Sequence, residues 1–258
     1  MSASLWCTRP GLAGGIDKDG SRAAELLAAG FGSVEFGTVT LRPQPGHNPG
    51  VAALVAALSA LDRQGRGATR IGIGLGAGVD TAPAALASEW LSAMEAAWPA
   101  ADYLSFNLSA RAYRPLLDAQ HAVLLRDSIA SVVRYREYLV RRTGRRAAVA
   151  LKLPLGAQGP SRETLQAIAG MGLDALIAVL PEGGERLAAL RELASDCRSG
   201  PNRPTLVAVG GIRSAEDVRA VRAAGAQGIQ VHSVFAERGS DCLSPLLAGM
   251  STPAEAGC

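Results

Sequence analysis

Eight short β-type segments alternate with helical patterns along almost the whole chain, and this alternation constrains the fold more than any other feature. Several segments are continuous apolar runs, such as ALIAVL and VAVGG, as expected for parallel strands that are covered on both faces. The predicted strands are Gly11–Asp17, Ser33–Val39, Thr69–Leu75, Tyr103–Ser109, Ala147–Pro154, Ala175–Pro181, Thr205–Gly211 and Gly228–Val234.

The segments between these strands show the 3.6-residue period of amphipathic helices, as in Leu86, Trp90 and Met94. Eight such units in 258 residues predict the α/β class and a (β/α)8 TIM barrel in a single domain, residues 1–258, with 240–258 as a flexible C-terminal tail. A doubly wound open sheet is the alternative. It is disfavoured because the glycines of GIGLGAG (Gly72–Gly78) lack the spacing of a dinucleotide-binding turn.

Composition excludes several classes of function. With 48% hydrophobic and 19% charged residues the chain is too apolar for disorder, and no apolar run is long enough to span a membrane. Aromatic residues make up only 4%, which leaves few stacking surfaces for single-stranded nucleic acid, so no nucleic-acid partner is expected. The four cysteines are scattered, and no His, Cys and carboxylate set has metal-ligand spacing. We therefore expect no metal and a reducing, cytoplasmic location.

In a (β/α)8 barrel, function lies at the carboxyl ends of the strands. A lysine inside a parallel strand, such as Lys152, needs an anionic partner because an unpaired buried ammonium is costly. Glycines after the seventh strand, followed by Ser233 after the eighth, match the usual phosphate cradle of this fold. Together these features predict a phosphorylated, anionic cofactor across the barrel mouth. The candidate residues at the strand ends are Gly14, Gly15, Lys18, Thr38, Asn107, Ser109, Lys152, Gly210, Gly211, His232 and Ser233.

Two long segments at these positions, GLAGGIDKDG (Gly11–Gly20) and FGSVEFGTVTLRPQPG (Phe31–Gly46), closely resemble the opening of class 2 dihydroorotate dehydrogenases, which are FMN-dependent (β/α)8 enzymes. The likeness continues in order through ADYLSFNLS, ALKLP, VGGIRSAEDVRAVRAAGA and IQVHSVF. It covers nearly the whole chain.

The resemblance implies a largely intact FMN site. Gly14, Gly15 and Lys18 would approach the flavin ring, Thr38 and Asn107 would hydrogen-bond the cofactor, and Lys152 would lie at the N1/O2 edge of the flavin. The phosphate region would be held by Gly210, Gly211, His232 and Ser233, with His232 in place of the family's usual tyrosine.

The dihydroorotate site departs from the family pattern. The family's loop after the fourth strand contains NxSSPN or NxSCPN, in which the second Ser or the Cys is the base, whereas this chain has Asn107-Leu108-Ser109-Ala110-Arg111-Ala112. Ala110 cannot accept a proton, and Ala112 replaces a pyrimidine-binding asparagine. Gly74 and Leu180-Pro181 replace further polar residues of the family, so we expect a divergent member that does not oxidise dihydroorotate.

The leading hypothesis is an FMN-dependent oxidoreductase that acts on a CH–CH or CH–NH group of a small carbonyl- or imine-activated substrate, in specialised biosynthesis. Its predicted catalytic residues are Lys152, Asn107, Ser109 and Tyr113, and its predicted substrate-binding residues are Lys18, Asn107 and Arg111.

Two alternatives stay open: a non-catalytic flavin-binding scaffold or partner subunit, and a barrel that has lost FMN and binds another phosphate compound. Only ten residues precede Gly11, too few for the family's membrane-docking extension, so we expect no membrane partner. The electron donor or acceptor is unknown, and the resemblance implies a homodimer.

Overall fold

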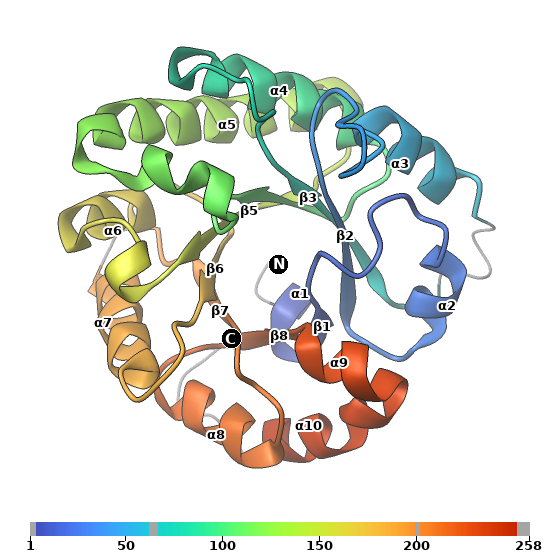
Figure 1. The fold of residues 1–258 in the computed structure, drawn as a ribbon, viewed down its shortest axis with the longest axis vertical. Coiled ribbons are helices and arrows are strands. Elements are labelled where there is room, and N and C mark those ends of the chain that lie inside the picture. Colours follow the sequence, from blue (N-terminus) through green and yellow to red (C-terminus); the bar gives the residue numbers. More distant parts are fainter. Residues whose placement is uncertain (1–3, 62–66, 200–201, 252–258) are drawn as a thin grey trace.

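The computed structural model describes residues 4–61, 67–199 and 202–251. Eight parallel strands pair in chain order and close into a barrel, with β8 returning to β1 (Figure 1). This topology confirms the predicted (β/α)8 TIM barrel. The strands are β1 (Gly11–Leu12), β2 (Ser33–Val39), β3 (Arg70–Leu75), β4 (Tyr103–Asn107), β5 (Ala148–Pro154), β6 (Ala175–Val179), β7 (Thr205–Val209) and β8 (Gly228–Val231).

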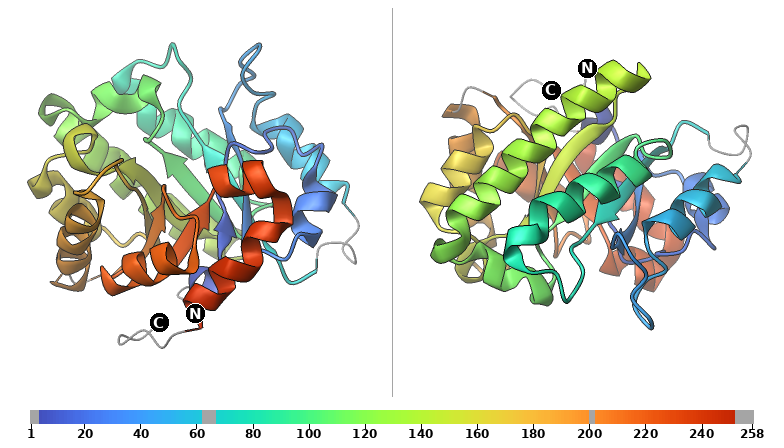
Figure 2. Two further views of the ribbon diagram at one scale, coloured as in Figure 1. Left: turned by 60° about the horizontal axis from the view of Figure 1, so that its bottom comes forward. Right: turned by 90° about the horizontal axis from the view of Figure 1, so that it is seen from above.

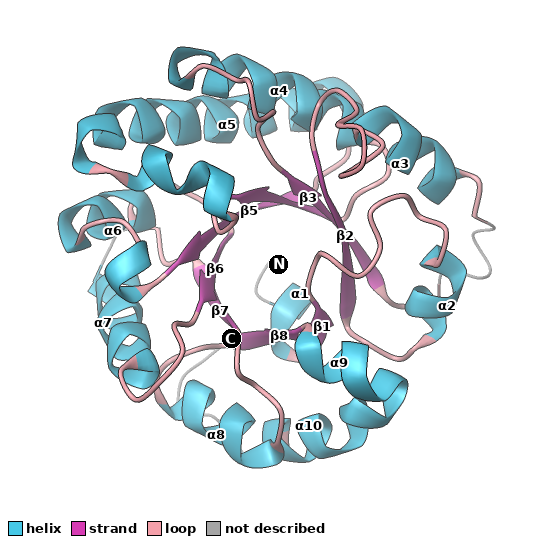
Figure 3. Cartoon of the chain, in the orientation of Figure 1, coloured by secondary structure: helices cyan, strands magenta, loops and turns pink. Residues whose placement is uncertain are grey.

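The helices form a ring around the strands, with at least one helix between each pair of consecutive strands (Figure 3). Seen from the side, they cover the outer face of the barrel (Figure 2). The α-helices are α1 (Ser4–Cys7), α2 (Ala23–Ala28), α3 (Val51–Ser59), α4 (Leu86–Ala97), α5 (Ala122–Thr143), α6 (Arg162–Ala169), α7 (Arg186–Ser199), α8 (Ala215–Ala223), α9 (Ser233–Arg238) and α10 (Leu243–Met250). Short 3₁₀ turns are η1 (Pro83–Ala85), η2 (Arg111–Leu117), η3 (Ala119–His121), η4 (Gly156–Gln158) and η5 (Gly239–Cys242).

The apolar core has two layers. Inside the barrel, small alanines surround Tyr103, Ile177 and Val207. Between the barrel and the helices, the predicted apolar face of α4 is buried, and Trp90 packs on Phe106 of β4 with ring centroids 5.0 Å apart. The continuous apolar runs of the sequence thus bury both of their faces, as parallel strands should.

The amino-terminal end of the barrel is closed by α1. Its Trp6 side chain is buried and meets Tyr103 edge-on, with ring centroids 5.2 Å apart. A β-carbon at Gly228, where β8 begins, would lie 2.8 Å from Trp6, so the absence of a side chain there allows α1 to dock. The amino-terminal end of the barrel is therefore closed, and a functional site is expected at the carboxyl-terminal end.

Strands β4, β6, β7 and β8 end two or three residues earlier than predicted, and two further boundary predictions are wrong by more. β1 ends at Leu12 rather than Asp17, because the backbone turns at Gly15 with φ +113° and the Asp17 carboxylate then accepts backbone N–H groups of Asp19, Gly20 and Arg22. The predicted flexible tail from residue 240 is helical up to Met250, because α10 packs its apolar side on α8. The rest of the predicted tail, residues 252–258, lies outside the described residues.

Candidate active site

A buried ion pair lies inside the barrel towards the carboxyl ends of the strands. Lys152 of β5 points inward, and its Nζ lies 3.2 Å from Oε1 of Glu35 on β2, with both side chains almost fully buried. The anionic partner that Lys152 requires is therefore supplied by the protein itself. Sequence reasoning missed Glu35, although a carboxylate inside an apolar strand is the same signal that singled out Lys152.

The second oxygen of Glu35 faces the barrel interior. Tyr103 Oη donates to Glu35 Oε2 at 3.4 Å, and Gln230 Nε2 reaches the same oxygen at 3.4 Å and Tyr103 Oη at 3.0 Å. Burial, followed by the negative charge of Glu35, raises the pKa of Tyr103 well above its usual value, so this phenol stays protonated. The network joins β2, β4, β5 and β8.

A chain of hydrogen bonds runs beside this ion pair. Asn107 Nδ2 donates to Thr38 Oγ1 at 2.7 Å, while Asn107 Oδ1 accepts from the backbone N and the Oγ of Ser109 at 2.8 and 2.6 Å. Asn107 is paired in register with Lys152 across β4 and β5. The structure thus brings together four of the predicted residues: Thr38, Asn107, Ser109 and Lys152.

Glycines pack closely against these polar groups. A β-carbon at Gly14 would lie 2.8 Å from Glu35 Oε1, and one at Gly74 would lie 3.4 Å from the same oxygen. A β-carbon at Gly15 would lie 3.0 Å from the His232 ring. Partial burial and the nearby Lys152 charge lower the pKa of His232, which favours the neutral imidazole. The predicted residues after β1 and β8 therefore meet at one rim of the mouth.

The predicted phosphate cradle lies between β7 and β8. Gly210 and Gly211 both adopt positive φ, at +107° and +66°, and Ser233 begins α9. Arg186 of α7 reaches this turn: its Nη1 donates to the Gly211 carbonyl at 2.9 Å and its Nη2 pairs with Asp217 at 2.7 Å. Arg186 was missed from the sequence because nothing in the β6–α7 loop sequence shows which way its side chain turns.

Three predicted residues lie apart from this group. Lys18 is exposed, and its Nζ donates to the backbone carbonyl of His47 at 3.3 Å, in the loop after β2. Tyr113 donates to the Ala77 carbonyl at 2.7 Å, and burial raises its pKa to about 12. The Tyr113 hydroxyl thus anchors η2 to the loop after β3, and a catalytic role for Tyr113 stays a prediction. Arg111 begins η2 with an exposed side chain.

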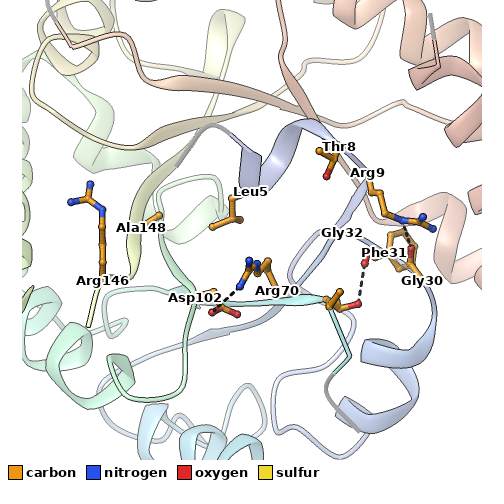
Figure 4. A pocket seen from close by; sticks show the side chains of 12 residues that line it. Leu5, Thr8, Arg9, Gly30, Phe31, Gly32, Arg70, Asp102, Arg146 and Ala148 are labelled. Atoms are coloured by element: carbon orange, nitrogen blue, oxygen red, sulfur yellow. Dashed lines mark hydrogen bonds and ion pairs between the residues drawn. The ribbon is translucent and has the colours of Figure 1, made fainter. Parts of the chain in front are cut away.

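A cavity of about 1000 Å³ lies at the opposite end of the barrel. Arg9, Arg70 and Arg146 project around it, with Leu5 and Phe31 among its apolar walls (Figure 4). Arg70 pairs loosely with Asp102 at 3.9 Å. This space borders the amino-terminal ends of β3 and β5 and contains none of the predicted site residues.

Within the described ranges, no group of His, Cys, Asp and Glu side chains could hold a metal ion. In the same ranges, no helix has the length and hydrophobicity needed to cross a membrane. The candidate site is therefore built from one ion pair, amides, hydroxyls and glycines. A closed parallel barrel with such a mouth defines the class of (β/α)8 enzymes.

Comparisons with known proteins narrow the class. Dihydroorotate dehydrogenase (quinone) of Alkalilimnicola ehrlichii is 31% identical over 284 residues, covering 93% of this chain and 82% of the relative. The protein of the same name from Akkermansia muciniphila is 30% identical over 281 residues, covering 94% and 81%. The chain belongs to the dihydroorotate dehydrogenase family of oxidoreductases.

A solved structure shares the fold. Eimeria tenella dihydroorotate dehydrogenase in complex with ferulenol matches with a TM-score of 0.72 and 20% identity, covering 94% of this chain and 80% of that chain. No protein-family model matches the sequence.

Proposed function

We propose that this chain is an FMN-dependent oxidoreductase that transfers hydride between flavin and a small carbonyl- or imine-activated substrate other than dihydroorotate. The observation that carries the proposal is the buried Glu35–Lys152 pair beside the Thr38–Asn107–Ser109 chain, with Gly14 packed closely against the carboxylate. Membership of an oxidoreductase family and the resemblance to FMN-dependent enzymes support the same reading.

The residues present fit a flavin. Gly14 and Gly74 let the backbone pack closely against the Glu35 carboxylate, because a β-carbon at Gly14 would lie only 2.8 Å from Oε1. Lys152 offers a cation, and Asn107 and Thr38 offer amide and hydroxyl groups at the ends of neighbouring strands. Gly210, Gly211, His232 and Ser233 form the predicted phosphate end, where the Gly211 carbonyl accepts a hydrogen bond from Arg186 at 2.9 Å.

Bound FMN would supply the hydride transfer itself. Lys152 would stabilise negative charge at the pyrimidine edge of the ring, and the neutral pair that it forms with Glu35 holds its ammonium in place. Ser109 fixes the Asn107 carbonyl, so the Asn107 amide is oriented before a substrate arrives. These contacts hold the Asn107 amide and the Lys152 ammonium in fixed positions.

The substrate assignment depends on the loop after β4. Oxidation of dihydroorotate needs a base beside the carbon that loses its proton, and loss of such a base typically slows a reaction by about 10²–10⁴-fold. Ala110 stands where the resemblance implies that base, and Ala112 and Gly74 remove amide contacts. The exposed Arg111 at the start of η2 is available to a carboxylate of a different substrate.

The test begins with the purified protein. We expect the visible absorption bands of oxidised flavin and about one FMN per chain released on heating, a stoichiometry that follows from one barrel mouth per chain. Dihydroorotate added without oxygen should leave the flavin oxidised, whereas a member of a panel of conjugated carbonyl and imine compounds, added to dithionite-reduced protein, should reoxidise it.

Each contrary result has its own meaning. Rapid bleaching by dihydroorotate would show that the chain keeps the activity for which its relatives are named. Flavin that no substrate, NAD(P)H or oxygen can cycle would favour the scaffold alternative. A protein that takes up no flavin would overturn the proposal. The matched control is Ala110→Ser, which restores a hydroxyl at the position of the lost base and should speed any residual bleaching by dihydroorotate.

A further inference from the structure

We propose that Glu35 is a positioning residue that holds the Lys152 ammonium beneath the flavin and, by neutralising it, lowers the reduction potential of the bound cofactor. This inference rests on the proposed function and extends it to a residue that does not itself reach the mouth. It assigns a role to the most deeply buried charge among the described ion pairs.

The geometry leaves the Glu35 carboxylate a single arrangement. Its side chain has no exposed surface, and Oε1 lies 3.2 Å from Lys152 Nζ on the side of the mouth. Oε2 is turned into the barrel, 3.4 Å from both Tyr103 Oη and Gln230 Nε2. Because each oxygen has partners on its own side, the carboxylate cannot rotate without breaking one set, and Lys152 is held with it.

Small residues make the arrangement possible. A β-carbon at Gly14 would lie only 2.8 Å from Oε1, so any larger residue there would displace the carboxylate or the loop. Gly74 of β3 approaches the same oxygen from the other side. The Glu35 carboxylate therefore packs directly against the backbone of Gly14 and Gly74.

The net charge of the Glu35–Lys152 pair determines its effect on the flavin reduction potential. Reduction of a flavin adds negative charge to the pyrimidine end of the ring, and a nearby cation favours the reduced form. An ion pair of no net charge favours it less than a bare ammonium would. Glu35 therefore fixes the position of Lys152 and moderates its electrostatic effect, while burial strengthens both because water does not screen the pair.

The experiment measures the midpoint potential of bound flavin in four proteins: wild type, Glu35→Gln, Lys152→Met and the double variant. We expect Glu35→Gln to raise the midpoint potential by at least about 30 mV. For a two-electron couple, this shift means that the protein's preference for reduced over oxidised flavin increases about tenfold. Lys152→Met should lower this preference by a similar factor. The double variant, which again carries no net charge, should return to within about threefold of wild type on the same scale.

Two controls separate charge from structure. Glu35→Asp keeps the charge and should stay near the wild-type potential. If Glu35→Gln alone does not fold, the double variant compared with Lys152→Met still measures the effect of removing the carboxylate charge. Tyr103→Phe removes a contact to Oε2 without changing charge, so its shift should be smaller than that of Glu35→Gln. A purely structural role for Glu35 would not produce opposite shifts that cancel in the double variant.

The outcomes are distinguishable from failure of the proposed function. A wild-type protein that takes up no flavin overturns the proposed function and this inference with it. Flavin-binding proteins in which Glu35→Gln leaves the potential unchanged, or shifts it in the same direction as Lys152→Met, overturn the inference alone.

Discussion

The two ends of this barrel differ in how far their charged side chains are buried. At the mouth, Lys152 and Glu35 are buried and paired at 3.2 Å under glycines. At the amino-terminal end, Trp6 closes the barrel, and the guanidinium groups of Arg9, Arg70 and Arg146 surround a cavity of about 1000 Å³. The arginines around this cavity are largely exposed, whereas the Lys152–Glu35 pair has been desolvated by the fold.

The difference teaches that the two charged regions must differ in electrostatic strength. Placing an ion pair inside a barrel carries a desolvation penalty that mutual attraction and further hydrogen bonds must offset. Exposed pairs such as Arg70–Asp102, at 3.9 Å, contribute little because water and salt screen them. We therefore assign function to the mouth and stability to the closed end.

Trp6→Ala should have the largest effect on the free energy of unfolding. The indole is buried against Tyr103 and the start of β8, and truncation of a buried tryptophan typically costs about 3–5 kcal/mol. Denaturant unfolding of the variant should show this loss. Its flavin content, measured on material that is still folded, should match wild type.

Trp6→Phe is the matched control and should recover most of the lost stability. A Trp6→Ala protein that folds normally but loses its flavin would contradict the assignment of stability to the closed end and of function to the mouth.

The same contrast explains how far the sequence could predict the molecule. Every predicted strand begins within one residue of the observed one, because the apolar runs and flanking glycines mark where the chain enters the barrel. The strand-end rule also located Thr38, Asn107, Ser109 and Lys152 in one place. The direction of the strands alone was enough to predict that these residues lie close together.

Side chains on loops were harder to place, because their direction depends on local backbone turns. Lys18 follows the turn at Gly15 and meets the His47 carbonyl, and Tyr113 turns down onto Ala77. Glu35 carried the same sequence signal as Lys152, a charged residue in an apolar strand, but only the closed barrel shows that the two are partners. Which side chains pair across a closed barrel depends on the tertiary structure and cannot be predicted from local sequence.

Arg186→Gln should have the next largest effect, which should be a loss of affinity for FMN. The guanidinium is held beside the glycine turn after β7 by Gly211 and Asp217, with further N–H groups left to donate to a phosphate. Loss of a charged hydrogen bond of about 1.5–3 kcal/mol corresponds to roughly 10–150-fold weaker FMN binding. Riboflavin, which lacks the phosphate, should bind both proteins equally in a fluorescence titration.

Arg213→Gln is the control for charge. Arg213 lies two residues beyond Gly211 but pairs with Glu237 on the surface, so its removal should leave the FMN-to-riboflavin affinity ratio unchanged. Equal weakening of FMN and riboflavin by Arg186→Gln would show that Arg186 shapes the loop and does not contact phosphate.

Arg70→Gln should have almost no effect, which sharpens the comparison at the closed end. Its pair with Asp102 is long and its side chain is largely exposed, so the expected change in the free energy of unfolding is below about 1 kcal/mol. The flavin potential and FMN affinity should stay at wild-type values. A clear loss of either would mean that the arginine-lined cavity communicates with the mouth.

His232 should contribute the smallest effect, visible only as a dependence of stability on pH. Its folded pKa is lowered below the ordinary value of 6.5, first by partial burial and then by the Lys152 charge. The unfolded chain therefore binds more protons than the folded one just below pH 6.5, and stability rises with pH through that window. Above it both states are neutral at this residue, and the contribution is constant.

The measurement compares the free energy of unfolding of wild type and His232→Gln, both without flavin, at pH 5.5 and pH 7.5. These values bracket the ordinary histidine pKa of about 6.5. Wild type should lose more stability than the variant on going to the lower pH, because only wild type carries an imidazole that burial keeps neutral. The same comparison in Lys152→Met should show a smaller loss, since one of the two causes of the lowered pKa is gone. An equal pH dependence in wild type and His232→Gln would show that the ring is not held against the mouth, and would remove the residues after β8 from the candidate site.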